Sequence, residues 1–138
     1  MRIKLNPIEV TVKDKRVVLI DDSIVRGTTM RRIVKLLRDT GAREIHLRIS
    51  STPFINPCYF GTDIDSRENL IACKMSVAEI CSYLGADSLG YLSINNVTKI
   101  AENAKCGFCA GCFTGAYPVP EPPANPISKY DQKITEAS

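Results

Sequence analysis

The 138-residue sequence has no apolar run that approaches the roughly 20 residues of a membrane-spanning helix. Its first ten residues, MRIKLNPIEV, also lack the apolar core of a secretory signal peptide. The sequence has little excess charge of either sign, because 18 Lys and Arg against 15 Asp and Glu leave a net charge of only +3. So small an excess argues against a nucleic-acid partner. These absences predict a cytoplasmic protein that binds neither membranes nor nucleic acids.

Two further absences narrow the chemistry. A Walker-type phosphate loop needs a lysine after its second glycine, and none stands in the run RVVLIDDSIVRGTT at residues 16–29. This loop therefore does not predict a nucleotide hydrolase. His46 is the only histidine, and it lies in an expected strand with no partner in view, so we interpret it as a structural residue.

The run 16–29 does contain the pattern of a phosphosugar site. Residues 17–20 predict a strand buried on both faces, and this strand leads into Asp21 and Asp22. Carboxylates at a strand end suit sugar hydroxyls or a hydrated Mg²⁺. A helix then begins near Thr28, and the N–H groups at a helix N-terminus suit a phosphate. Gly27 permits a close approach to the anion, although the Thr28 hydroxyl is equally suited to cap the helix.

Hydrophobic spacing predicts that strands alternate with helices. Residues 8–12 alternate weakly and indicate a short strand or extended arm. Helical spacing from residue 28 ends at Gly41, which suits a C-terminal cap, and residues 45–49 alternate as the next strand. A strand, a helix and a strand in this order predict a βαβ unit with parallel strands. The phosphate loop would then lie at the carboxyl edge of the sheet.

The rest of the chain gives shorter signals. We expect a short helix at 67–72, a helix at 77–84, a short strand at 89–92 and a helix at 93–104. Ser76 and Glu79 form a capping box for the second of these, and Gly85 ends it. After Phe113 we expect loops. The residues expected to face inward are Val77, Ile80, Leu84, Val97 and Ile100.

Six cysteines in a cytosolic chain favour metal binding or free thiols over disulfides. Cys106, Cys109 and Cys112 follow one another at three-residue spacing, which is a compact arrangement for a soft metal, and Cys58 follows a proline far off in the sequence. An iron–sulfur cluster, a zinc site with all four thiols, and free thiols all remain open. The other two, expected to be small buried residues, are Cys73 and Cys81.

Three segments in order resemble the glutamine phosphoribosylpyrophosphate amidotransferase family, a branch of the type I phosphoribosyltransferases. They read RIKLNPIEVTVKDKRVVLIDDSIVRGTT, ISSTPFINPCYFGTD and CGFCAGCFTGAYP, and the resemblance extends to about Pro118. It implies an α/β fold, the type I phosphoribosyltransferase-like parallel sheet with flanking helices on both faces. Residues 1–118 would be the C-terminal part of that domain, and 119–138 a proline-rich, poorly ordered tail.

The resemblance implies an amidophosphoribosyltransferase, which converts 5-phosphoribosyl 1-pyrophosphate (PRPP), glutamine and water to 5-phosphoribosylamine, glutamate and pyrophosphate in purine synthesis. It implies Mg²⁺, purine nucleotides as regulators and a homo-oligomer. The family's glutaminase half has no counterpart here, so we expect a fragment, or a reading frame begun internally, that is inactive alone. Two other hypotheses are a non-catalytic PRPP- or nucleotide-binding module and a metal-binding interaction module.

When the site residues of the family are transferred to the matching positions of this sequence, the resemblance implies a binding site without a catalytic acid or base. Asp21 and Asp22 would contact the ribose hydroxyls and Mg²⁺. A [4Fe–4S] cluster would take Cys58, Cys109 and Cys112, with its fourth ligand from a segment absent from this sequence or replaced by Cys106. The residues that would wrap the 5′-phosphate are Ser23, Arg26, Gly27, Thr28 and Thr29.

Overall fold

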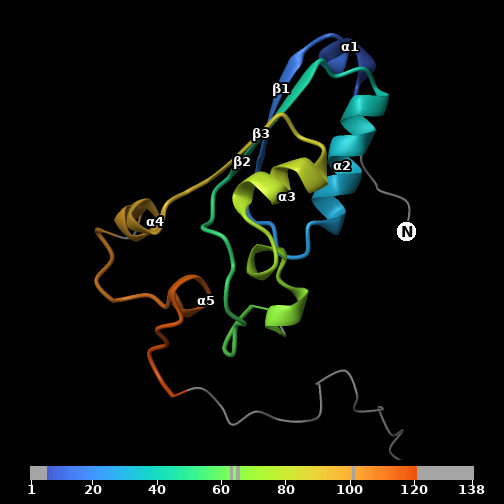
Figure 1. The fold of residues 1–138 in the computed structure, drawn as a ribbon. Helices are drawn as coiled ribbons and strands as arrows, with labels where there is room; N and C mark the ends of the chain where they lie inside the picture. The colour runs from blue at the N-terminus through green and yellow to red at the C-terminus, as the bar shows by residue number, and fades with distance from the viewer. Residues whose placement is uncertain (1–5, 63, 65, 101, 121–138) are drawn as a thin grey trace, which may run out of the picture.

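The computed structural model describes residues 6–62, 64, 66–100 and 102–120. Strands and helices alternate along this part of the chain (Figure 1). The tail expected at 119–138 lies almost wholly outside the described residues, so the boundary near 118 stays a prediction. In chain order the elements are α1 (Glu9–Val12), β1 (Arg16–Asp21), α2 (Thr28–Asp39), β2 (Glu44–Ile49), the 3₁₀ turns η1 (Arg67–Asn69) and η2 (Ile71–Cys73), α3 (Val77–Leu84), β3 (Ser88–Tyr91), α4 (Ile94–Ile100) and α5 (Gly111–Thr114).

The strands form a parallel sheet in the order β1-β2-β3. The predicted βαβ unit is confirmed, because α2 connects two strands that pair in parallel. In the register, Asp21 is opposite Ile49, and Ile49 is opposite Tyr91. The three strands therefore end at one edge of the sheet, and the loop that follows β1 leaves from that edge.

The core lies between one face of the sheet and the helices α2 and α3. Ile45 and Leu47 of β2 are fully buried, and they belong to the same cluster as Val34 of α2 and Ile80 of α3. Every second residue of β1 points away from this cluster, which leaves Val18 60% and Ile20 73% exposed. The expectation that β1 is buried on both faces, with helices on each, is therefore wrong for the described residues. Because Val and Ile occupy both faces of β1, its sequence alone does not reveal the open face.

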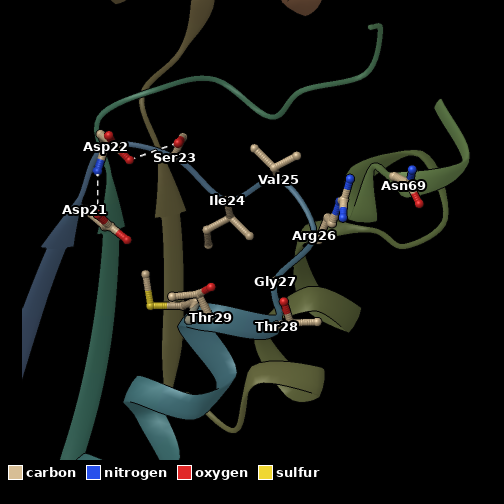
Figure 2. A pocket seen from close by; sticks show the side chains of 11 residues that line it. Asp21, Asp22, Ser23, Ile24, Val25, Arg26, Gly27, Thr28, Thr29 and Asn69 are labelled. Carbon is tan, nitrogen blue, oxygen red and sulfur yellow. Dashed lines mark hydrogen bonds between the residues drawn. The ribbon is translucent and has the colours of Figure 1, made fainter. Parts of the chain in front are cut away.

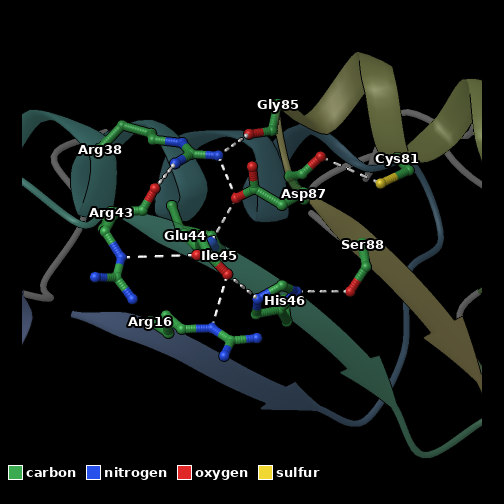
Figure 3. A network of polar contacts seen from close by, with 11 residues as sticks. Arg16, Arg38, Arg43, Glu44, Ile45, His46, Cys81, Gly85, Asp87 and Ser88 are labelled. Carbon is green, nitrogen blue, oxygen red and sulfur yellow. Dashed lines mark hydrogen bonds and ion pairs between the residues drawn. The ribbon is translucent and has the colours of Figure 1, made fainter.

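The amino edge of the sheet carries a polar network (Figure 3). Asp87 accepts hydrogen bonds from Ile45 N at 2.6 Å and from the guanidinium of Arg38, which joins β2, β3 and α2. His46 bonds through Nδ1 to Ser88 Oγ at 2.9 Å and through Nε2 to Glu44 Oε2 at 3.1 Å. The interpretation of His46 as a satisfied structural residue is confirmed.

The signals at the ends of the helices are largely confirmed. Ser76 and Glu79 make the reciprocal capping box of α3, with Ser76 N donating to Glu79 Oε2 at 2.7 Å. Gly85 at φ +77° ends α3, and Gly41 at φ +93° follows α2. Both glycines adopt a left-handed conformation that other residues resist. The short helix expected at 67–72 is instead the pair of 3₁₀ turns η1 and η2.

Three local expectations are wrong. Residues 8–12 contain the helical turn α1 instead of a strand, because Lys13 N donates to Glu9 O at 2.8 Å and their side chains pair at 3.0 Å. The helix expected at 93–104 ends at Ile100, which is 75% exposed instead of inward. Val77 is likewise 42% exposed, because it begins α3 on the solvent side. Within the described ranges, no helix has the length and apolar character that crossing a membrane requires.

Candidate functional site

An open cavity of about 940 Å³ lies at the carboxyl edge of the sheet, around the loop that joins β1 to α2 (Figure 2). All seven residues predicted for the phosphosugar site line this cavity. Eleven of the described residues line it; ten of them are consecutive, and the eleventh comes from η1. The lining residues are Asp21, Asp22, Ser23, Ile24, Val25, Arg26, Gly27, Thr28, Thr29, Met30 and Asn69.

The cavity has an acidic end at Asp21 and Asp22. Asp22 N donates to Asp21 Oδ1 at 3.0 Å, and Ser23 Oγ donates to Asp22 Oδ1 at 2.9 Å (Figure 2). Ser50 fixes the end of β1 by donating its N–H and hydroxyl to Asp21 O at 3.0 and 3.1 Å. Among the described residues, no ion pair to either carboxylate is present. Their oxygens can therefore accept hydrogen bonds from hydroxyls or bind a hard cation.

The other end of the cavity is the N-terminus of α2, where the helix begins at Gly27 with φ +75°. The alternative role of Thr28 as the helix cap is wrong, because Gly27 takes that position and no described side chain caps the helix. The first-turn N–H groups of a helix have no intrahelical acceptor, and here the residues of the first turn line the cavity. Arg26, next to this turn, adds a cationic side chain. This end suits an anion.

The loop is held in place by packing against the main core and by a backbone hydrogen bond from η2. Ile24 is 2% exposed and belongs to the main core. Ile71 N donates to Val25 O at 3.0 Å, which ties η2 to the loop. A Cβ at position 27 would lie 2.8 Å from Ile71 Cδ1, so the end of the Ile71 side chain would have to shift to admit any residue but glycine. Asn69 reaches the cavity because η2 is fixed in this way, and sequence reasoning missed it because no local pattern links positions 26 and 69.

A second cluster joins this loop to the cysteine-containing segments. We call it the Leu70 cluster: its buried residues are Phe54, Ile64 and Leu70, and those packed against it are Val25, Cys58, Cys112 and Phe113. The backbone holds the two cysteine segments together, since N–H groups of residues 55 and 56 both donate to Cys112 O, at 3.1 and 3.0 Å. Tyr117 also donates to Pro57 O at 2.6 Å. The sequence-distant segments around Cys58 and Cys112 therefore lie side by side.

The environments of the thiols differ. Burial alone would raise the pKa of Cys58, but the N–H groups of Gly61, Phe60 and Thr62 outweigh it and lower the pKa to about 7. Burial raises the pKa of Cys112, and the nearby Cys58 and Cys109 thiols raise it further. Cys106 is exposed.

Cys73 and Cys81 are both expected to be buried, and the structure differs between them. Cys81 is partly buried, and burial raises the pKa of its thiol. Cys73 is exposed, so the expectation that it is buried is wrong. It lies at the end of η2, where its Sγ donates to Ile55 O at 3.3 Å.

The described residues do not by themselves make a metal centre. No group of three or more His, Cys, Asp or Glu side chains among them has an arrangement that could hold a metal ion. Cys58, Cys109 and Cys112 interact electrostatically, but a [4Fe–4S] cluster usually takes about four thiolates. The proposed ligand set, with Cys106 as the alternative fourth thiol, therefore stays a prediction.

Comparisons with known proteins agree with this geometry. A family model described as the phosphoribosyl transferase domain matches residues 4–52, which include β1, α2 and the cavity loop. The amidophosphoribosyltransferase of Archaeoglobus fulgidus is 51% identical over 124 residues, which are 88% of this chain and 27% of the relative. The Bacillus subtilis enzyme is 48% identical over 122 residues, which are 86% of this chain and 26% of the relative.

Solved structures give the same result. The glutamine PRPP amidotransferase of B. subtilis, complexed with ADP and GMP, aligns with a TM-score of 0.76 at 48% identity, over 86% of this chain and 27% of that one. A structure described as the allosteric regulatory enzyme of purine biosynthesis aligns with a TM-score of 0.84 at 42% identity, over 97% of this chain and 30% of that one. The chain spans about a quarter of the length of the relatives that it matches. It belongs to the amidophosphoribosyltransferase family and corresponds to a portion of the phosphoribosyltransferase domain.

Proposed function

We propose that this chain binds the ribose 5-phosphate part of PRPP, as the phosphoribosyltransferase portion of an enzyme that forms 5-phosphoribosylamine from PRPP and glutamine. The observation that carries the proposal is the cavity around residues 21–30, with two carboxylates at one end and an uncapped helix N-terminus at the other. A phosphorylated sugar has the matching polarity, because its hydroxyls donate hydrogen bonds and its phosphate accepts them. About 50% identity to amidophosphoribosyltransferases supports this choice of ligand.

The reaction replaces pyrophosphate by ammonia at the anomeric carbon of the ribose. Bond breaking leaves an oxocarbenium-like sugar, so positioning and charge stabilisation contribute more than proton transfer. Asp21 and Asp22 would accept hydrogen bonds from the ribose hydroxyls and stabilise positive charge on the ring. The 5′-phosphate would be held by the first turn of α2 and by the loop before it, through Ser23, Arg26, Gly27, Thr28 and Thr29. None of these groups needs to act as an acid or base.

The acidic end also fits Mg²⁺. This cation is typically bound by one or two carboxylates together with substrate phosphates and waters, and Asp21 and Asp22 are two adjacent carboxylates without a described ion-pair partner. When bound, Mg²⁺ would neutralise negative charge on the pyrophosphate. The two aspartates would hold the cation from the protein side and orient the ribose.

Titration calorimetry of PRPP with Mg²⁺ into the purified chain tests the proposal. We expect saturable micromolar binding. The paired substitutions Asp21→Asn and Asp22→Asn should lower the affinity about tenfold or more, because each removes hydrogen bonds to a charged acceptor. Asp39→Asn is the matched control, since Asp39 is exposed at the end of α2, where it pairs with Lys35, and does not line the cavity. Equal affinity of the paired variant and the control would contradict the phosphosugar site.

The activity of the chain alone is a separate question, because it spans only about a quarter of its relatives. We propose that glutamine-dependent formation of 5-phosphoribosylamine belongs to the longer protein. The chain would then bind PRPP without releasing pyrophosphate when glutamine or ammonia is supplied. Production of 5-phosphoribosylamine by the chain alone would overturn this expectation.

A second candidate role concerns the thiols, and the packing of Cys58 and Cys112 against the Leu70 cluster favours it. We propose that Cys58, Cys109 and Cys112 supply three of the thiolates of a [4Fe–4S] cluster in the longer protein. Anaerobic loading with iron and sulfide tests this, with bound iron and sulfide as the readout. Cys109→Ser should reduce the iron retained, and Cys106→Ser should leave it unchanged. The reverse result would exchange the roles of these two residues.

Regulation is the last part of the proposal. One relative is described in complex with ADP and GMP. We therefore propose that purine nucleotides bind the longer protein, assembled as a homo-oligomer. Competition between GMP and PRPP in the same calorimetric assay would reveal whether this chain contains a nucleotide site that overlaps the cavity. Additive binding of the two ligands would argue against an overlap.

A further inference from the structure

Tyr117 follows the C-terminal cysteine segment in the sequence and contacts the loop around Cys58. Its hydroxyl donates to Pro57 O at 2.6 Å, next to Cys58. The centroid of its ring lies 5.1 Å from that of Tyr59 and 6.1 Å from that of Phe60. Tyr117 therefore binds the residue before Cys58 through its hydroxyl and packs against the two residues after it through its ring.

The Tyr117 ring also packs on Gly111, the residue before Cys112. A Cβ at position 111 would overlap Cδ1 and Cε1 of the ring, so the ring lies directly against the glycine backbone. Gly111 N donates to Cys109 Sγ at 3.4 Å. The backbone that Tyr117 covers is thus the backbone that joins two of the thiols.

A turn after α5 brings Tyr117 to this place. Gly115 ends α5 with φ +80°, a conformation that other residues resist. A Cβ on Gly115 would lie 3.5 Å from the side-chain amide of Asn56, so the turn passes close to the loop around Cys58. Tyr117 follows two residues later and is half-buried. The path of the chain therefore returns Tyr117 to the cysteine segments.

The thiols come from segments that are far apart in the sequence. Cys58 and Cys112 are partly buried and pack against the Leu70 cluster, whereas Cys109 is exposed. The N–H groups of residues 55 and 56 join the two segments through Cys112 O, and Tyr117 adds a side-chain link between the same segments. Ordering flexible groups during binding costs free energy, so a link that holds the segments together beforehand favours a shared ligand.

We propose that Tyr117 is a positioning residue of the thiol site, which holds the loop around Cys58 against residues 109–112 and so keeps the three thiols close to one another. The inference rests on the second candidate role proposed above for these cysteines, and it adds a residue that is not itself a ligand. Tyr117 acts through two contacts, which are its hydroxyl on Pro57 O and its ring on Gly111. Each contact can be removed separately.

Alkylation of the purified chain with iodoacetamide, followed cysteine by cysteine with mass spectrometry, tests the hydroxyl contact. Tyr117→Phe keeps the ring and should raise the rate at Cys58 about fivefold, which corresponds to about 1 kcal/mol, because the loop opens more often. The rate at Cys81 should stay unchanged, since this thiol lies on α3 and reports opening of the whole fold. Tyr83→Phe is the matched control, because Tyr83 packs against the main core and the Arg31 guanidinium.

A double-mutant cycle tests the ring contact. Gly111→Ala places a Cβ in the space of the Tyr117 ring, and it should raise the rate at Cys58 about tenfold although position 111 lies in the other segment. In a Tyr117→Ala background the same substitution should change that rate by less than about twofold, because no ring is left to displace. Gly107→Ala is the matched control, since its Cβ would meet no described atom within 4 Å.

The outcomes separate this inference from the proposed thiol role. A wild-type rate at Cys58 in either Tyr117→Phe or Gly111→Ala would overturn the inference. Equal increases at Cys58 and Cys81 would also overturn it, because they would indicate unfolding of the whole chain. In anaerobic loading with iron and sulfide, Tyr117→Phe should retain less of both than wild type. A wild-type chain that retains neither would overturn the thiol role, and the alkylation rates would still decide whether Tyr117 holds the segments together.

Discussion

Replacing Gly27 by alanine tests whether the loop conformation itself forms the anion site. Gly27 has φ +75° and begins α2, and its carbonyl accepts the first helical hydrogen bond from Arg31 N at 2.9 Å. Alanine at this position meets two obstacles. The left-handed conformation disfavours any Cβ, and the new Cβ would lie 2.8 Å from Ile71 Cδ1.

The size of the effect follows from these two costs and from one term that offsets them. The left-handed backbone costs an alanine about 1–2 kcal/mol. Overpacking typically adds about 1–3 kcal/mol, and here the lower part of that range applies because the contact is the end of the Ile71 side chain. The smaller entropy of the unfolded alanine chain offsets about 0.4–1 kcal/mol. We expect Gly27→Ala to lower the free energy of unfolding by about 2 kcal/mol.

Urea unfolding and ribose 5-phosphate calorimetry measure the two consequences. The folded variant should bind ribose 5-phosphate about tenfold more weakly, because the shifted backbone no longer directs its N–H groups at the phosphate. Gly61→Ala is the matched control: its Cβ would meet nothing within 4 Å, so its stability and binding should stay near wild type. If Gly27→Ala matched Gly61→Ala in both measurements, the strained loop would not be what shapes the site.

Three further substitutions test the packing and the polar network. Leu70→Ala should lower the free energy of unfolding by about 2–5 kcal/mol in a urea titration, because Leu70 is fully buried and its loss leaves a cavity beneath the loop. Ser76→Ala should lower it by about 1 kcal/mol through loss of the α3 cap, while Ser82→Ala on the exposed side of α3 stays within about 0.5 kcal/mol of wild type. The Ile45 N–H, and then the Arg38 guanidinium, hold the pKa of Asp87 below its ordinary value, although burial partly opposes them. A carboxyl with a lowered folded-state pKa stabilises the fold above its unfolded pKa of about 4 and loses that contribution as the pH falls further. The stability difference between wild type and Asp87→Asn should therefore narrow below about pH 4, and a constant difference from pH 7 to pH 3 would contradict this reasoning.

The part of the fold that the sequence predicts is the part that local signals determine. The strand that leads into Asp21, the helix α2 with Gly41 after it, and the strand β2 each depend on spacing and end residues within one segment. The cavity loop was predictable for the same reason, because ten of the described residues that line the cavity are consecutive in the sequence. Local chemistry in a continuous stretch therefore gave both the βαβ unit and most of the site.

The parts that the sequence does not predict depend on contacts between distant segments. Asn69 enters the cavity only because Ile71 binds Val25, and no spacing along the chain encodes that contact. The open face of β1 could not be recognised either, since Val18 and Ile20 are as apolar as their buried neighbours. Residues 9–12 form a helical turn against their alternating pattern, because the backbone hydrogen bonds of Thr11 N and Lys13 N and the ion pair of Lys13 with Glu9 outweigh a weak preference.

The two edges of the sheet carry polar residues with opposite tasks. At the amino edge, Asp87 and Glu44 have cationic and N–H partners within the fold, so these carboxylates help to hold the strands together. At the carboxyl edge, Asp21 and Asp22 have no described ion-pair partner and face the cavity. A carboxylate that has hydrogen-bond and ion-pair partners within the protein stabilises the fold, whereas a carboxylate whose partners come from a ligand does not. Asp87→Asn should therefore lower the stability and leave the ribose 5-phosphate affinity unchanged. Asp21→Asn should lower the ribose 5-phosphate affinity and leave the stability unchanged. If both variants lost both stability and affinity, the two edges would not be independent.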